Sequence, residues 1–144
     1  MILKKPCNRY KRSIAGMTLL ELLIVISIIS ILASIAYPSY SQYVKESYRK
    51  QALTDMARVQ LFLEEHQLQN AALHEISDNG VCNDFCQSDP HRYRISLNIS
   101  ANHYVITAIP QRDSGQDEDT CQGQGYSKLT LTDTGLTTPQ ACWK

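Results

Sequence analysis

The sequence predicts an α+β fold, in which a long N-terminal helix packs on a C-terminal antiparallel sheet of three to four strands. Two observations lead to this expectation. No Gly or Pro occurs between Pro38 and Gly80, and apolar residues in this stretch recur at helical spacing. Further along the chain, apolar and polar residues alternate with the period of two that marks a half-buried strand. A helix with an apolar stripe and strands with one apolar face can cover each other, which gives a two-layer domain.

The first half of the expected helix is strongly apolar. The run from Leu22 to Ala36, lengthened by Met17–Leu20, reaches the roughly 20 residues that a membrane span needs. Pro38 removes a backbone donor and clashes with the preceding turn, so we expect a helix kink there. The second half is amphipathic and is expected to end near Gln69. Its predicted apolar stripe consists of Leu53, Met56, Ala57, Gln60, Leu61 and Leu68.

Three strands are expected in the C-terminal half. The first covers Tyr93 to Ile99, where apolar side chains alternate with Arg94, Ser96 and Asn98. After a turn through residues 100–102, a second strand covers Tyr104 to Ile109. A third runs from Lys128 to Thr132. A fourth short strand near the C-terminus would have no supporting pattern.

Charge is distributed unevenly along the chain. Residues 1–16 hold five basic residues and no acid, namely Lys4, Lys5, Arg9, Lys11 and Arg12. The remainder holds 9 basic and 14 acidic residues, a net charge of −5. A basic opening before an apolar run is typical of a membrane-targeting signal whose positive end stays in the cytoplasm. The acidic remainder disfavours a general nucleic-acid binder but leaves room for a local basic patch.

The junction between the basic opening and the apolar run carries a specific motif. It reads Gly16-Met17-Thr18-Leu19-Leu20-Glu21, followed by the run Leu22-Leu23-Ile24-Val25-Ile26. This motif resembles the class III signal of type IV prepilins, in which a Gly precedes a bulky apolar residue and a Glu stands five residues into the mature chain. Met17 occupies the place where that family usually has Phe.

The resemblance implies a maturation pathway and a type IV pilin fold. A membrane prepilin peptidase would cut between Gly16 and Met17 and methylate the new amine of Met17. Residues 1–16 would then be a leader, residues 17–38 an assembly and membrane helix, and residues 39–144 a periplasmic or extracellular globular domain. The subunit would stay in the inner membrane as a single-pass protein until the assembly platform adds it to a filament of other pilins, homo- or heteropolymeric.

Glu21 is predicted to direct assembly. A carboxylate inside an apolar span costs roughly 2.5 to 3.5 kcal/mol, so it normally has a partner or a function. The free amine of Met17 in a neighbouring subunit is the expected counter-ion, and the pair would fix the axial register of the filament. The alternative is that Glu21 extends to the headgroups at the membrane edge.

Four cysteines follow the leader, while Cys7 lies within it. Two disulfides are expected in a chain exported across the inner membrane, and sequence alone allows three pairings. The stretch from Asp119 to Trp143 resembles the C-terminal disulfide region of PilE-like minor pilins, which implies a bond between Cys121 and Cys142. Cys82 and Cys86 would then close a small local loop. A zinc site of Cys82, Cys86, His91 and His103 is the alternative; we expect no metal and no other cofactor.

The chain contains no recognisable catalytic motif, so it is not expected to be an enzyme. The leading interpretation is a minor pilin that contributes to filament assembly, twitching motility, adhesion or DNA uptake. A pseudopilin of type II secretion is an alternative, because Asp117-Glu118-Asp119 could imitate the calcium loop of that class.

The second interpretation is a pilin that captures DNA during natural transformation. Its candidate contacts are Arg92, Arg94, Arg112 and Lys128, with Tyr93 or Tyr104 stacking on bases. Arg92 and Arg94 are expected to share one strand face. The competing interpretation is an ordinary solvated strand face.

Overall fold

The computed structural model describes residues 16–66, 70–100 and 103–144. It divides after Pro38 into an N-terminal unit and a C-terminal unit, Ser39–Lys144. The predicted leader, apart from Gly16, lies outside the described residues, as does part of the turn expected at residues 100–102.

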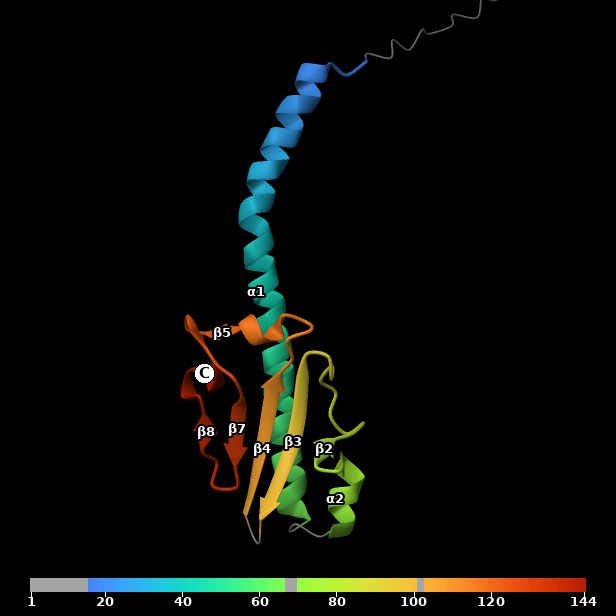
Figure 1. The fold of residues 1–144 in the computed structure, drawn as a ribbon, viewed down its shortest axis with the longest axis vertical. Helices are drawn as coiled ribbons and strands as arrows, with labels where there is room; N and C mark the ends of the chain where they lie inside the picture. The colour runs from blue at the N-terminus through green and yellow to red at the C-terminus, as the bar shows by residue number, and fades with distance from the viewer. Residues whose placement is uncertain (1–15, 67–69, 101–102) are drawn as a thin grey trace, which may run out of the picture. The chain divides into compact units, whose positions relative to one another are not determined.

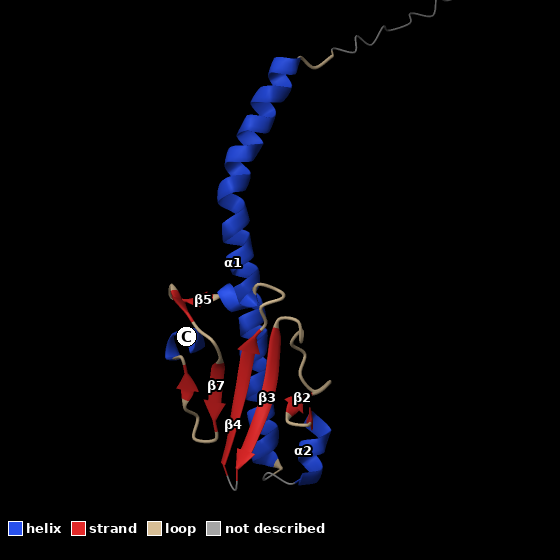
Figure 2. Ribbon diagram, in the orientation of Figure 1, coloured by secondary structure: helices blue, strands red, loops and turns tan. Residues whose placement is uncertain are grey.

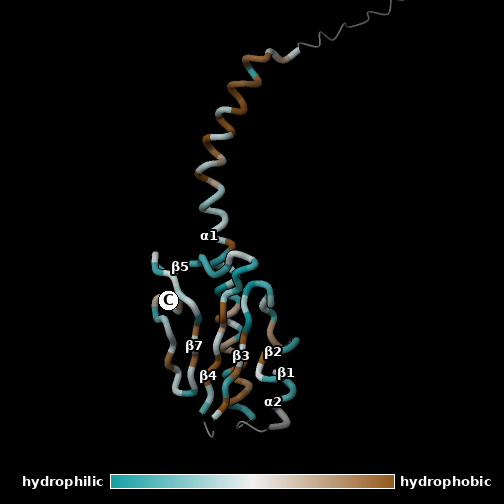
Figure 3. Tube along the Cα trace, viewed as in Figure 1, coloured by the Kyte–Doolittle hydropathy of each residue, from teal (hydrophilic) through white to brown (hydrophobic). Residues whose placement is uncertain are grey.

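The N-terminal unit contains the first part of helix α1 (Leu19–Glu65). Thr18 caps this helix, because its hydroxyl accepts a hydrogen bond from the Glu21 backbone N–H at 3.2 Å. The helix is long and apolar enough to cross a membrane, and its part before Pro38 is the strongly hydrophobic one (Figure 3). The large hydrophobic side chains of this part are exposed. The α1 helix continues through Pro38 without a break, so a kink there stays a prediction.

The C-terminal unit holds the rest of α1 and a six-stranded antiparallel sheet in the order β1-β2-β3-β4-β7-β8 (Figures 1 and 2). These strands are β1 (Ser77–Asp78), β2 (Val81–Cys82), β3 (Tyr93–Ser100), β4 (His103–Pro110), β7 (Leu129–Thr132) and β8 (Thr137–Thr138). The remaining elements are α2 (Asn70–Ile76), the hairpin of β5 (Thr120–Cys121) and β6 (Gln124–Gly125), and the 3-10 helices η1 (Gln116–Glu118) and η2 (Gln140–Trp143).

The core lies between α1 and the inner face of the sheet. In β3, the alternation predicted from sequence is confirmed, since Tyr93, Ile95 and Leu97 are buried while Arg94 and Asn98 are exposed. These apolar residues pack in one cluster with α1 side chains such as Met56. The α+β prediction is therefore confirmed, although the sheet has six strands instead of three to four.

The helical stripe was predicted less well. Met56 is buried, but Ala57 and Leu61 are exposed. The buried stripe consists of Arg49, Ala52, Asp55, Met56, Val59 and Leu63. Two of its members, Arg49 and Asp55, are charged, and neither belongs to the stripe predicted from sequence. The α1 helix ends at Glu65, four residues before the expected end at Gln69, which itself lies outside the described residues.

The short strands depend on tight turns. Asn79 and Gly80 connect β1 to β2 and both have positive φ, 51° and 76°, as an Asn-Gly hairpin turn requires. The carbonyl of Gly80 also accepts a hydrogen bond from the Leu97 N–H at 2.7 Å, which brings this turn against β3. A side chain at Gly80 would meet the Leu97 carbonyl oxygen at 3.1 Å. Glycine at position 80 therefore allows both the positive φ of the turn and the close approach of the turn to Leu97 on β3.

Candidate functional site

The residues of the predicted processing motif lie at the start of α1. Met17 is 58% exposed, and Glu21 is exposed in the first turn. The N-terminus of a helix favours a negative charge, which suits Glu21 at this place. Among the residues that the structure describes, no cation pairs with its carboxylate.

Three of the four predicted DNA contacts gather at one end of the sheet. Arg94 on β3 lies directly opposite Ile109 on β4. Lys128 immediately precedes β7, in which Leu129 pairs with Ala108 of β4. Continued by one residue, this register places Lys128 opposite Ile109, on the side of β4 away from Arg94. Arg112 follows two residues after the end of β4. All three cations are exposed, and Arg112 makes only a loose ion pair with Asp117, at 3.7 Å.

Arg92 differs from these three residues. Its guanidinium lies 4.6 Å from the centre of the Tyr48 ring on α1, and its Nη1 donates a hydrogen bond to the Ser114 carbonyl at 3.0 Å. Arg92 is therefore packed between elements of the domain and is less accessible than Arg94. The expectation that Arg92 and Arg94 share one strand face is wrong, because β3 begins at Tyr93 and Arg92 lies outside it.

The two tyrosines proposed to stack on bases are buried. Tyr93 is 2% exposed and Tyr104 is 5% exposed, because both lie on the inner face of the sheet. The Tyr104 hydroxyl donates to Glu64 on α1 at 3.3 Å. Neither ring offers a free face, so base stacking by these residues is ruled out.

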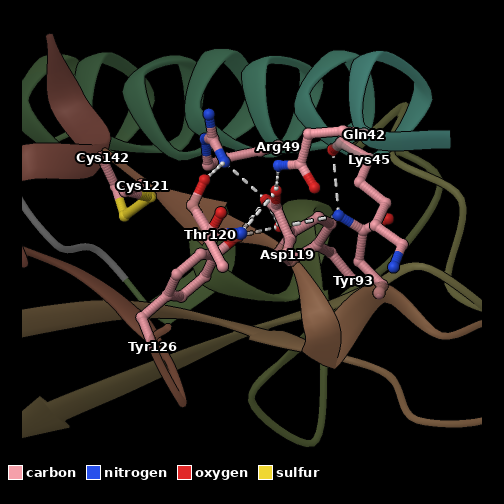
Figure 4. The surroundings of a disulfide bond; sticks show 10 residues. Gln42, Lys45, Arg49, Tyr93, Asp119, Thr120, Cys121, Tyr126 and Cys142 are labelled. Atoms are coloured by element: carbon pink, nitrogen blue, oxygen red, sulfur yellow. Dashed lines mark hydrogen bonds and ion pairs between the residues drawn. A yellow bond between two sulfur atoms is a disulfide. The ribbon is translucent and has the colours of Figure 1, made fainter. Parts of the chain in front are cut away.

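A buried charged network fixes the loop before β5 to α1 (Figure 4). The Arg49 guanidinium donates to the Asp119 carboxylate at 2.6 Å and to the Thr120 carbonyl at 3.1 Å. Asp119 also accepts from the Gln42 amide at 3.0 Å and from the Tyr126 hydroxyl at 2.6 Å. The Arg49 and Asp119 side chains are 10% and 0% exposed. Cys121, which is bonded to Cys142, comes two residues after Asp119.

The network changes the ionisation of its members. Burial opposes the charge of Arg49, but the charge and hydrogen bond of Asp119 outweigh it, so the pKa of Arg49 is raised. Burial, together with the hydrogen bond to Asp119, strongly raises the pKa of Tyr126. Burial also raises the pKa of Tyr93, whose hydroxyl contacts the Tyr126 hydroxyl and accepts from the Gln116 amide at 3.1 Å. Both phenols stay neutral, and the network carries one buried ion pair.

A second buried charge fixes the other disulfide loop. The Asp55 side chain on α1 is 0% exposed, and it accepts two hydrogen bonds from Ser88, at 2.6 Å from the N–H and 2.5 Å from the hydroxyl. Ser88 lies two residues after the Cys82–Cys86 bond. A buried charged side chain of α1 is therefore bonded to a segment next to each disulfide.

The acidic cluster of η1 does not resemble a calcium loop. Asp119 pairs with Arg49, Glu118 pairs with Lys45 at 2.9 Å, and Asp117 faces Arg112. Because each carboxylate meets a different cation, the cluster does not converge on one point. The hydrogen bond from Lys45 lowers the pKa of Glu118.

The cysteines form the bonds Cys82–Cys86 and Cys121–Cys142, with Cα–Cα distances of 6.0 and 5.0 Å. These are the pairs that the resemblance favoured. Bonded sulfurs cannot act as thiolate ligands, so the zinc alternative loses two of its four ligands. In the parts of the chain that the structure describes, no group of three metal-ligating side chains is found.

Comparison with known protein families decides the identity. The family model described as "Type IV minor pilin ComP, DNA uptake sequence receptor" matches residues 38–124, which is more than half of the chain. The chain belongs to this family of type IV minor pilins. A second model, the prokaryotic N-terminal methylation motif, matches residues 11–37 of the minor pilin. Searches of the curated proteins and of the solved structures gave no match.

The two family matches cover different predicted site residues of the minor pilin. The methylation motif includes Gly16, Met17 and Glu21, and the minor-pilin model includes Arg92, Arg94 and Arg112. Lys128 lies beyond the match. The family is one of structural pilin subunits, and its name favours the pilus over the type II secretion system.

Sequence reasoning missed the buried charges Arg49, Asp55 and Asp119. A signal for two of them existed, because Arg49 and Asp55 stand three residues before and after Ala52, on the same face of the helix. Asp119 has no comparable local signal.

Proposed function

We propose that this minor pilin binds DNA through Arg94, Arg112 and Lys128 and presents it for uptake. The observation that carries the proposal is the gathering of these three exposed cations at one end of the sheet, from strands that are neighbours in space. Phosphate contacts from clustered Arg and Lys supply most of the non-specific affinity for DNA. The description of the family as a DNA uptake sequence receptor supports the same function.

The net charge of −5 outside the leader does not contradict this proposal. Charges separated by more than about 8 to 10 Å in physiological salt are largely screened. A bound duplex therefore interacts mainly with the charges of the patch that it touches, and little with the net charge of the domain. Several acids are already paired with cations elsewhere, such as Asp119 with Arg49 and Glu118 with Lys45. Arg92, packed against Tyr48, would contribute its charge from a fixed position.

The proposal includes maturation and assembly. Prepilin peptidase cuts after Gly16 and methylates Met17, and the apolar half of α1 holds the subunit in the inner membrane. Glu21 then pairs with the Met17 amine of a neighbouring subunit as the assembly platform adds it to the extracellular filament. The methylation-motif match and the membrane-compatible helix support these steps. Twitching motility and adhesion would be functions of that filament, and the chain itself would catalyse no reaction.

The direct test is DNA binding by the full chain in neutral-detergent micelles. Fluorescence anisotropy with a labelled duplex would be measured between about 50 and 200 mM salt. The variant Arg94→Gln/Arg112→Gln/Lys128→Gln should bind more weakly, and its log–log salt slope should be smaller by roughly one unit per lost phosphate contact.

Lys50→Gln is the matched control, because Lys50 is an exposed cation on α1 that pairs with Glu46. It should bind like the wild type. Absence of salt-dependent binding by the wild type, or an unchanged slope in the triple variant, would refute the proposed function.

A further inference from the structure

We infer that the sheet docks the sugar-phosphate backbone of duplex DNA through uncharged hydroxyl groups as well as through cations. The surface is the side of β3, β4, β7 and β8 that is turned away from α1, called the outer face below. This inference rests on the proposed DNA-binding function and extends it to residues that do not carry charge.

The strand register places four hydroxyl side chains in one row across the outer face. Ser96 lies opposite Thr107, Thr107 opposite Thr130, and Thr130 opposite Thr138. Directly opposed residues project from the same face of a sheet. Because neighbouring strands lie about 4.8 Å apart, the row extends over about 14 Å.

The outer face is free of negative charge over these four strands. None of β3, β4, β7 and β8 contains an acidic residue, although the domain as a whole is acidic. The rows on either side of the hydroxyls hold Arg94, Ile109 and Lys128 on one side and Asn98, Val105 and Thr132 on the other. Carboxylates begin at the margins, with Asp78 on β1 and Asp133 after β7. The charge pattern therefore complements a polyanion.

Hydroxyl and amide side chains are frequent donors to phosphate oxygens, alongside Arg and Lys. Reading bases in the major groove requires a helix or a two-stranded ribbon that enters it. Figures 1 and 2 show β3 and β4 as neighbouring strands of the sheet, with the C-terminal half of α1 behind them. A sheet face of this kind suits backbone contact, which positions a duplex without reading its sequence.

Thr107 and Thr130 are suited to a test. Both are half-buried on the outer face, and Val preserves the shape and the β-branching of Thr in a strand. Among the described residues, no hydrogen bond of the Thr107 hydroxyl is found, while the Thr130 hydroxyl bonds that of Thr138 at 2.5 Å. Replacing both with Val removes two donors and no charge.

The experiment compares the full chain in micelles with Thr107→Val/Thr130→Val, using two labelled duplexes, one of mixed sequence and one with the same bases shuffled. The variant should bind both duplexes about tenfold more weakly, since each lost hydrogen bond contributes about threefold or more. Its salt slope should equal that of the wild type, because no cation has been removed. Ser96→Ala, a smaller change, should act in the same direction.

Thr54→Val is the matched control, because Thr54 is exposed on α1 and makes a hydrogen bond to the Lys50 carbonyl. Equal loss in this control, wild-type affinity in the double variant and in Ser96→Ala, or loss for one duplex alone would each overturn the inference. Wild-type affinity in the hydroxyl variants together with a reduced slope in the cation variant would leave the proposed function standing. No binding by the wild type would overturn both.

Discussion

Arg49, Asp55 and Asp119 are the residues that most constrain the domain. Arg49 and Asp55 stand on the buried stripe of α1, where an uncompensated charge would be costly. Arg49 finds its counter-ion in Asp119, whereas Asp55 lies 3.5 Å from Arg58 on the same helix and accepts hydrogen bonds from Ser88 in a distant loop. Asp119 lies 70 residues after Arg49. The segments that these residues hold lie next to the loops closed by the two disulfides. Buried charge therefore fixes which part of the C-terminal half lies against which part of the helix.

Asp119→Asn should destabilise the domain by about 3 kcal/mol, because it leaves Arg49 buried without its counter-ion. Unfolding in urea can be followed by the fluorescence of Trp143, the single tryptophan of the chain. Glu118→Gln is the matched control, since Glu118 is 75% exposed in its ion pair with Lys45. We expect little change there. Equal effects of the two substitutions would show that the Arg49–Asp119 pair does not stabilise the fold.

Alkaline pH should destabilise the domain through Tyr126. Its pKa is raised above the ordinary value of 10.0 in the folded state, so the unfolded state loses the phenolic proton first. Stability should therefore be full below pH 10 and fall as the pH rises further. Tyr93 acts in the same direction.

The measurement is urea unfolding of Cys7→Ser chains across this range, which avoids thiol exchange between Cys7 and the two disulfides. Tyr126→Phe should show a shallower fall than the parent chain. An identical pH profile in both chains would contradict the raised pKa.

At the scale of elements, the sequence predicted the strands in which apolar and polar residues alternate and missed the strands that are too short to alternate. The strands β3, β4 and β7 were found because apolar and polar residues alternate along them. β1, β2 and β8 are two residues long, too short for any alternation to show, and they exist because an Asn-Gly turn and pairing with longer neighbours hold them. The sheet was therefore expected with fewer strands than it has.

The errors at the candidate site have the same origin. Tyr93 belongs to the apolar set whose alternation predicted β3, so the same pattern places its ring on the inner face and excludes base stacking. Ala57 and Leu61 were assigned to the helical stripe by hydrophobicity, yet the buried stripe follows Ala52, Met56 and Leu63. A local pattern gives a period but does not by itself say which face the rest of the chain will cover.

At the scale of the whole molecule, assembly and DNA capture are proposed for different parts of the chain. The carboxylate of Glu21 belongs to the N-terminal unit, while Arg94, Lys128 and the outer face belong to the C-terminal unit. Residues 11–37 match a general methylation motif, whereas the match to the DNA-uptake family model begins at Pro38. The two activities should therefore be separable by mutation.

The measurement that tests this most directly scores filament incorporation and DNA uptake side by side in cells that express the chain. Sheared filaments would be probed for the subunit, and uptake of labelled duplex would be counted in the same culture. Arg94→Gln/Lys128→Gln should enter filaments at the wild-type level and take up clearly less DNA, whereas Glu21→Val should lose both. Normal uptake by the Arg94→Gln/Lys128→Gln filaments, or normal incorporation of Glu21→Val, would contradict the account.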